Sequence, residues 1–147
     1  MDAQDAVSLD DRDEPMRADG GDVSVRLLTG DAVAVVAPGA TLQQVAEELV
    51  TDEVGLLVVG TVDRVEGVVS ERDVVRAVAL GKVPDSTLVT EVASTRLVWC
   101  DATATVDEVA ELMLERYVRH VLVEEDGQLV GVVSARDLLG AYVAAPE

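Results

Sequence analysis

A seven-residue block that occurs twice holds the side chains best suited to chemistry. Residues 67–73 read Gly-Val-Val-Ser-Glu-Arg-Asp, and residues 131–137 read Gly-Val-Val-Ser-Ala-Arg-Asp. A serine hydroxyl and an arginine can donate hydrogen bonds to a phosphate, and an aspartate can accept hydrogen bonds from both hydroxyls of a ribose. If the block starts a helix, backbone amides and the helix dipole add to the attraction for an anion. These residue types therefore indicate a nucleotide site.

The same spacing also has a purely structural interpretation. Ser-x-x-Asp is a capping box, in which the two side chains satisfy amides at a helix start without any ligand. For a single copy this interpretation would suffice. The repetition of the whole block, including an arginine that capping does not require (Arg72 and Arg136), favours nucleotide binding by at least one copy.

The two blocks belong to a longer duplication with an offset of 64 residues. The same offset aligns Thr41 with Thr105 and residues 45–47 with residues 109–111. Each threonine begins a capping box, Thr-x-x-Gln or Thr-x-x-Glu, and apolar residues follow it at helical spacing. Each copy therefore has a helix that begins at this threonine.

Two short apolar runs follow this helix in each copy. They cover residues 54–59 and 65–69, then 118–123 and 129–133, and are rich in β-branched residues and too short for helices. Each pair predicts a hairpin, after which the serine of the block begins a second helix. The predicted fold is α/β (α+β), with two β-α-β-β-α repeats around a pseudo-twofold axis.

The length and the charge distribution predict the domain organisation. A chain of 147 residues fits one compact domain of ordinary size. Residues 1–22 are acidic and poor in apolar side chains, so we expect a disordered tail. The first repeat then covers residues 23–83 and the second covers residues 84–147.

The charge of the chain limits its partners. The formal net charge is −18, from 29 acidic and 11 basic residues, which disfavours nucleic acid and anionic membranes as partners. No apolar run is long enough for a membrane span, and the acidic start does not resemble a signal peptide. We expect a cytoplasmic protein with a halophilic composition, although an ordinary acidic protein is the alternative.

The remaining reactive side chains do not form a catalytic or metal site. His120 is the single histidine and Cys100 the single cysteine, so neither a metal cluster nor a Cys-His pair nor an internal disulfide can be built from them. No glycine-rich loop with a lysine for phosphate binding occurs. Trp99 could stack on an adenine, but it also suits a buried or partner-facing position. We expect neither catalysis nor a resident metal or cofactor.

The duplicated block, the 64-residue offset and the element order resemble the CBS (cystathionine β-synthase) domain pair, over about residues 25–145. The resemblance implies a disc-like module with two clefts for a regulatory AMP, ADP, ATP or S-adenosylmethionine. It implies that Asp73 and Asp137 hold ribose hydroxyls. The phosphate contacts that it implies are Ser70, Arg72, Ser134, Arg136, Arg119 and His120. The adenine edge that it implies includes Val36, Pro38, Val98 and Cys100.

The two implied clefts differ in one position that commonly contacts phosphate in this family. The second copy has Arg119-His120 there, whereas the first has Gly55-Leu56. The two sites are therefore expected to be unequal. Arg119 has an alternative interpretation as a solvated charge at the end of a strand.

Two functions remain open at this point. The first is a regulatory module that binds an adenosine-containing ligand and signals in trans to an unknown effector protein, as a homodimer. The second is a module for dimerisation or protein interaction that needs no ligand. The recurrence of both aspartates favours the first.

Overall fold

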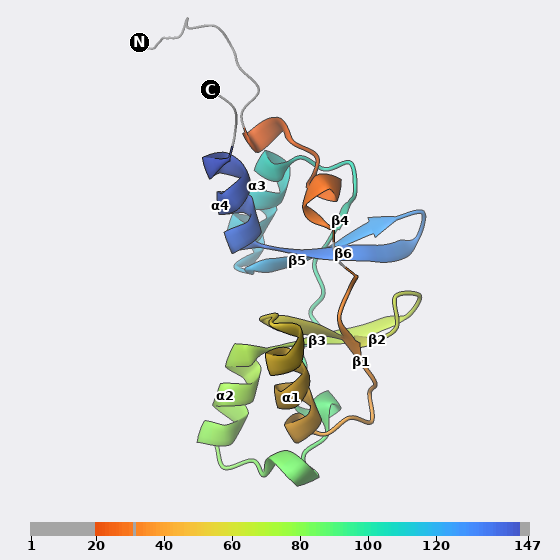
Figure 1. Ribbon diagram of the computed structural model, residues 1–147, viewed down its shortest axis with the longest axis vertical. Coiled ribbons are helices and arrows are strands. Elements are labelled where there is room, and N and C mark those ends of the chain that lie inside the picture. Colours follow the sequence, from red (N-terminus) through yellow and green to blue (C-terminus); the bar gives the residue numbers. More distant parts are fainter. Residues whose placement is uncertain (1–19, 31, 145–147) are drawn as a thin grey trace, which may run out of the picture.

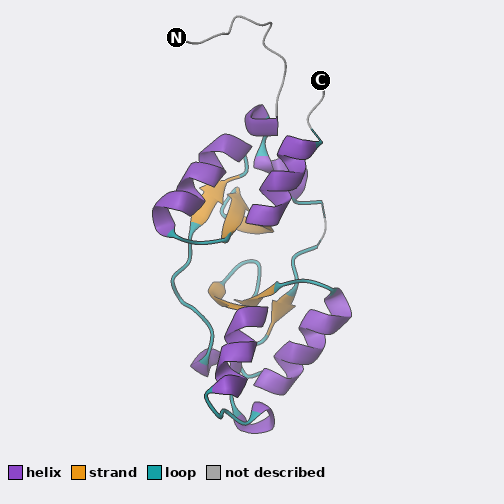
Figure 2. Ribbon diagram, turned by 90° about the vertical axis from the view of Figure 1, so that its left-hand side faces the viewer, coloured by secondary structure: helices purple, strands orange, loops and turns teal. Residues whose placement is uncertain are grey.

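The structure of the protein is a computed structural model that describes residues 20–30 and 32–144. Two halves are stacked along the long axis, with their sheets facing each other in the middle and their helices on the outside (Figure 1). Figure 2 shows the same layering from the side. Residues 1–19 of the predicted tail lie outside the described part. The last three residues of this tail are ordered, contrary to the expectation from the sequence. They form a short 3-10 helix, η1 (Gly20–Asp22), which contacts the second half.

The first half has the predicted order of elements. It consists of β1 (Val35–Val36), α1 (Leu42–Asp52), β2 (Leu56–Gly60), β3 (Val65–Ser70) and α2 (Glu71–Ala79). The sheet order is β1-β2-β3, in which β1 is parallel and β3 antiparallel to β2.

The second half repeats this arrangement. It consists of β4 (Trp99–Asp101), α3 (Val106–Arg116), β5 (His120–Glu125), β6 (Gln128–Ser134) and α4 (Ala135–Val143). Its sheet order is β4-β5-β6, again with one parallel and one antiparallel pair. The predicted mixed fold of two β-α-β-β-α units is confirmed.

The second strand of each half begins two residues later than predicted, because α1 and α3 end in a wider turn. Glu53 and Tyr117 adopt left-handed backbone conformations, with φ of 54° and 57°. The next amide then closes the helix: the N–H of Val54 donates to the carbonyl of Leu49 at 3.3 Å, and the N–H of Val118 donates to that of Met113 at 3.1 Å. Residues 54 and 118 thus belong to the helix end.

The helix starts are capped as predicted. The Thr41 hydroxyl accepts from the amide of Gln44 at 3.2 Å, and the Gln44 side chain accepts from the Thr41 amide at 2.8 Å. Thr105 and Glu108 repeat the pair at 3.2 and 2.9 Å. α1 and α3 have 11 residues each, and no helix in the described part of the chain is long and apolar enough to span a membrane.

Each half completes its core with the segment that precedes the other half. Val25 lies in the 3-10 helix η2 (Val25–Leu28), before the first half, yet it is fully buried in the core of the second. Its amide donates to the carbonyl of Ala104 at 2.8 Å. Val89, which is 64 residues later, is fully buried in the core of the first half, and its amide donates to Ala40 at 2.8 Å.

A third apolar cluster joins the two sheets. Val58 from β2 and the pair Leu122 and Leu129 from β5 and β6 are buried there. The half-buried side chains packed around them come from both halves: Val33, Val65, Val68, Leu97, Trp99 and Val132. Trp99 therefore serves the contact between the halves.

This cluster generates a stability prediction. Leu122→Ala removes a side chain that is only 3% exposed, and the resulting cavity should lower the free energy of unfolding by about 2–5 kcal/mol. Leu114→Ala is the matched control, because Leu114 is 77% exposed and its loss should cost less than about 0.5 kcal/mol. Urea unfolding followed by circular dichroism measures both, and equal losses would contradict the assigned packing.

Candidate functional site

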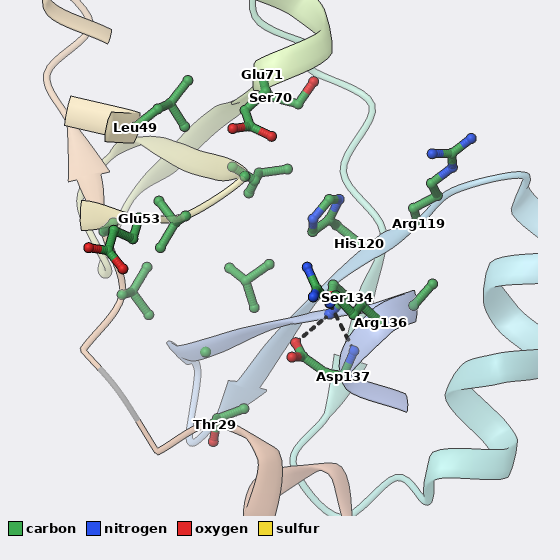
Figure 3. Close-up of a pocket in the computed structure, with 18 of the residues that line it drawn as sticks. Thr29, Leu49, Glu53, Ser70, Glu71, Arg119, His120, Ser134, Arg136 and Asp137 are labelled. Carbon is green, nitrogen blue, oxygen red and sulfur yellow. Dashed lines mark hydrogen bonds between the residues drawn. The ribbon is translucent and has the colours of Figure 1, made fainter. Parts of the chain in front are cut away.

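A cleft of about 1060 Å³ lies between the two halves, at the upper end of the range for small-molecule sites. Figure 3 shows Ser70 and Glu71 on one side of it, Ser134 and Asp137 on the other, and His120 between them. The described residues that line it are Leu28, Thr29, Ala32, Val33, Ala34, Leu49, Val50, Glu53, Val54, Gly55, Leu56, Ser70, Glu71, Arg72, Tyr117, Arg119, His120, Gly131, Val132, Ser134, Ala135, Arg136 and Asp137.

Both Ser-x-x-Asp motifs form capping boxes. The amide of Ser134 donates to Oδ2 of Asp137 at 2.8 Å, and the amide of Asp137 donates to the Ser134 hydroxyl at 3.0 Å. Ser70 and Asp73 make the same pair at 2.8 and 3.2 Å. The structural interpretation of the motif is thus confirmed in both copies, and it occupies one oxygen of each carboxylate.

The second oxygen distinguishes the two aspartates. Oδ1 of Asp73 lies 3.5 Å from Nη1 of Arg76, and the Asp73 side chain is 21% exposed. Asp137 is exposed and lines the cleft, and its Oδ1 has no hydrogen-bond or ionic partner among the described residues. Asp137 is therefore the aspartate that can accept hydrogen bonds from a molecule in the cleft.

The helix starts offer fewer amides than the sequence indicated. The first amide of α4, from Ala135, donates to the carbonyl of Arg119 at 2.8 Å, and the first amide of α2, from Glu71, donates to Gly55 at 3.0 Å. The third amide of each helix donates to the capping serine. An anion would therefore depend mainly on side chains, because two of the first three amides already have acceptors.

Three arginines are among the described residues that line the cleft, Arg72, Arg119 and Arg136. None of them makes an ion pair or a side-chain hydrogen bond with another residue in the described part of the chain. The described residues that line it also include three acidic ones, Glu53, Glu71 and Asp137. In a chain of net charge −18, the cleft thus contains arginines without an ionic partner in the described part of the chain.

His120 lies on the cleft wall at the start of β5, where it pairs with Ser134 of β6. Burial lowers its pKa below the usual 6.5; the nearby Asp137 carboxylate opposes this shift and Arg119 reinforces it. The imidazole is therefore mainly neutral near pH 7. The corresponding residue of the first half is Leu56, which pairs with Ser70.

Two residues that the sequence analysis did not single out also line the cleft. Glu53 and Tyr117 are 64 residues apart and are the left-handed residues that end α1 and α3. Glycine or asparagine is the usual sign of such a helix end, and neither occurs at these positions. The sequence signal that could have found them is the duplication itself, because Glu53 and Tyr117 occupy equivalent positions in the two copies.

The residues expected at the adenine edge lie elsewhere. Val36, Pro38, Val98 and Cys100 are not among the described residues of the cleft wall. Val98 is buried in the core of the second half. Cys100 packs against the same core, where burial, Asp101 and Glu124 raise its pKa to about 11. The segment before β1 reaches the cleft two to four residues earlier, at 32–34.

Comparison with known proteins identifies the repeats. Residues 25–80 and 89–144 each match the CBS domain. The chain belongs to the CBS domain family. The two matches lie within the predicted repeats, residues 23–83 and 84–147, and CBS domain pairs of this kind act as regulatory modules.

Two relatives show how far the similarity extends. Hypoxic response protein 1 of Mycobacterium tuberculosis is 30% identical over 117 residues, which cover 78% of this chain and 82% of the relative. An uncharacterised protein of Methanopyrus kandleri is 28% identical over 120 residues. This match covers 80% of the chain described here but only 61% of the length of the Methanopyrus protein.

Solved CBS structures share the fold. The CBS domain protein PAE2072 of Pyrobaculum aerophilum, complexed with AMP, is 33% identical with a TM-score of 0.73, covering 83% of this chain and all of that one. The structure of hypoxic response protein 1 with two coordinated zinc ions is 29% identical with a TM-score of 0.67, covering 80% and 98% of the two chains.

The position of His120 generates a pH prediction. Because its pKa is lowered in the folded CBS pair, the unfolded chain binds the proton more readily, and the folded state loses stability as the pH falls below about 6.5. His120→Gln removes the only imidazole. Urea unfolding from about pH 7.5 to about pH 5.5 should show a larger loss for the natural protein than for the variant. Parallel losses would contradict the assigned environment.

Proposed function

We propose that this CBS pair binds an adenosine-containing ligand in the cleft beside Asp137 and signals its occupancy to a partner protein in trans. The ligand class is AMP, ADP, ATP or S-adenosylmethionine. The observation that carries the proposal is a group of polar side chains on the cleft wall without partners among the described residues: Oδ1 of Asp137 and the guanidinium groups of Arg72, Arg119 and Arg136.

The ribose and the adenine would bind at the second half's end of the cleft. Asp137 keeps its backbone cap through Oδ2 and offers Oδ1 to the ribose hydroxyls. Beside it, residues 32–34, Leu28 and Val132 form a mainly apolar wall, which suits a flat base. In this proposal the adenine edge is formed by residues 32–34 and not by Val36, Pro38, Val98 or Cys100.

The phosphates would face the arginines. A hydrogen bond between a guanidinium and a phosphate contributes about 1.5–3 kcal/mol, and within the described ranges the three arginines have no side-chain partner to give up. Ser70 and Ser134 use their hydroxyl oxygens as caps but can still donate. His120, neutral near pH 7, would act as a hydrogen-bonding group and not as a cation.

Signalling would follow from the shared walls of the cleft. Residues of both halves line it, so a ligand would contact both halves at once. If the two halves differ slightly in arrangement between two states, a ligand that prefers one state shifts the population toward it. An effector that reads this arrangement would then respond to the nucleotide.

The comparisons support a nucleotide more than a metal. The similar PAE2072 structure holds AMP. The similar hypoxic response protein 1 structure holds two zinc ions, but in the described part of this chain no group of three His, Cys, Asp or Glu side chains could hold a metal ion. The adenosine-containing ligand is therefore the better supported of the two.

Thermal unfolding with AMP, ADP, ATP and S-adenosylmethionine tests the proposal. A ligand that binds only the folded state adds about 2.7 kcal/mol at a hundredfold excess over its dissociation constant. The stabilisation should disappear in Asp137→Asn, since the amide group keeps an acceptor for the Ser134 cap but loses the carboxylate charge.

Asp73→Asn is the matched control. Asp73 occupies the same position of an identical capping box but does not line the cleft, so this variant should keep the ligand response. Absence of stabilisation by all four ligands in the natural protein would overturn the proposal and leave the capping boxes as purely structural motifs.

A ligand-independent dimerisation module is the second candidate function, and exposed apolar side chains on α2 and α4 favour it. Val75 and Val78 on α2 are 67% and 52% exposed, and Leu139 and Val143 on α4 are 64% and 85% exposed. Apolar side chains that gather on two helices are typical of a surface that pairs with another copy. The two functions are compatible, because these side chains are not among the described residues of the cleft wall.

Sedimentation velocity tests this candidate. The natural protein should show a concentration-dependent dimer, and Leu139→Asp should shift it to the monomer, because a buried unpaired carboxylate disfavours the contact. Leu114→Asp, on α3 at a position that is 77% exposed against 64% for Leu139, should leave the dimer intact. A natural protein that sediments as a monomer would remove this candidate.

A further inference from the structure

The cleft does not follow the symmetry of the duplication. Its central part is lined by residues from both halves in pairs 64 positions apart, such as Ser70 with Ser134 and Arg72 with Arg136. Beyond this centre the wall extends in one direction only. It includes Asp137 and residues 32–34, but not Asp73 or residues 96–98, which are their equivalents.

One side chain accounts for part of this difference. Nη2 of Arg96 donates to the carbonyl oxygen of Arg116, at the end of α3, at 2.6 Å. The equivalent of Arg96 is Ala32, whose methyl group cannot reach across to the end of α1. On the Asp137 side, residues of this segment and of the end of α1 both line the cleft. On the Asp73 side, the exposed Arg96 side chain links the equivalent segment to the end of α3 through this hydrogen bond.

A backbone bridge on the same side holds the segment that carries Arg96 in place. The amide of Val68 donates to the carbonyl of Ser94 at 2.9 Å, and the amide of Ser94 donates back to Val68 at 2.8 Å. This bridge holds the segment before β4 against β3. Close packing against the third strand of each half is common to both sides: a Cβ on Gly67 would lie 2.9 Å from the Ser94 carbonyl oxygen, and one on Gly131 would lie closer still to Cβ of Thr29. The difference lies in the bridge. On the Asp137 side, Gly30 occupies the position of Ser94 and Val132 that of Val68, and no such bridge joins these two described residues.

The polar groups of the two sides agree with this difference. Both carboxylate oxygens of Asp73 have partners, one in the cap and one near Arg76. Asp137 keeps one oxygen without a partner in the described part of the chain. The Asp73 side thus combines the Arg96 contact with an aspartate whose two carboxylate oxygens both have partners.

We propose that Arg96 determines the stoichiometry of nucleotide binding, by closing the Asp73 side of the CBS pair so that the chain binds one nucleotide, at Asp137. The inference rests on the proposed function and adds to it. The duplication predicts two equivalent sites, and a single linker side chain reduces them to one. Removal of that side chain opens a second site, at Asp73.

Isothermal titration with AMP tests this inference. The natural protein should bind one AMP per chain, and Asp137→Asn should abolish the binding whereas Asp73→Asn should not. Arg96→Ala should bind two AMP per chain, and Arg96→Ala combined with Asp73→Asn should return to one. The reciprocal variant Ala32→Arg should lose the Asp137 site, because it places the longer side chain on the open side.

Arg64→Ala is the control for the loss of one positive charge, since Arg64 is exposed in the loop between β2 and β3; it should keep one site. Two sites in the natural protein, or one site in Arg96→Ala with an unchanged circular dichroism spectrum, would overturn the inference and leave the proposed function intact. No AMP binding by the natural protein or any variant would overturn both for this nucleotide. Binding by Arg96→Ala alone would support the role of Arg96 and contradict the Asp137 site.

Discussion

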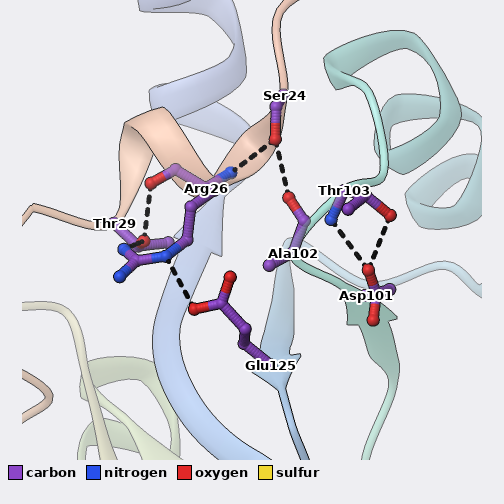
Figure 4. Close-up of polar contacts among 7 residues, drawn as sticks. All are labelled: Ser24, Arg26, Thr29, Asp101, Ala102, Thr103 and Glu125. Carbon is purple, nitrogen blue, oxygen red and sulfur yellow. Dashed lines mark hydrogen bonds and ion pairs between the residues drawn. The ribbon is translucent and has the colours of Figure 1, made fainter.

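The exchange of two buried valines between the halves is the constraint on which the rest of the arrangement depends. Val25 must reach the core of the second half and Val89 the core of the first, so the segments that follow them must cross back between the halves to begin β1 and β4. These crossing segments carry Ala32 and Arg96. The walls of the cleft are therefore a consequence of how the cores are completed, and not a separate addition to the fold. Figure 4 shows the polar contacts of the residues on either side of Val25. The Ser24 hydroxyl donates to the Ala102 carbonyl, and the Arg26 side chain contacts Glu125 and Thr29.

The parts of this arrangement that could be predicted are those with a local cause. The capping boxes at Thr41 and Thr105 and the repeated Gly-Val-Val-Ser-x-Arg-Asp block depend on residues three to six positions apart, so the element order and the family followed from them. The inequality of the two sides could be predicted only in part, from Arg119-His120 against Gly55-Leu56. The closing of one side depends on where a long side chain ends in space, at the carbonyl of Arg116, 20 positions away. The sequence also did not indicate that the segment before β1 reaches the cleft wall at residues 32–34, ahead of Val36 and Pro38, because the exposed start of a two-residue strand leaves no pattern.

Charge gives the cleft its character within a chain of net charge −18. Carboxylates are abundant, yet the three arginines of the cleft have no ionic partner among the described residues. Outside the cleft, Arg64, Arg96 and Arg116 likewise have none in the described part of the chain, whereas Arg26, Arg76 and Lys82 lie near carboxylates. Exposed pairs of this kind contribute little to stability. The distribution is more informative about binding, because a phosphate that enters the cleft meets cations that need not leave another partner.

The exchange of Val25 and Val89 also bears on how a duplicated chain of this kind can arise. In each repeat, the buried valine at this position comes from the other repeat. A single repeat could therefore complete its core only by pairing with a second copy, with each copy supplying the valine for the other. Joining two copies in one chain makes that association intramolecular, with an effective concentration that reaches the millimolar range for short links. The fused pair is in this sense a dimer made covalent. Once the copies share one chain, each can change independently, and a difference such as Ala32 against Arg96 becomes possible that no symmetric pair of identical repeats could carry.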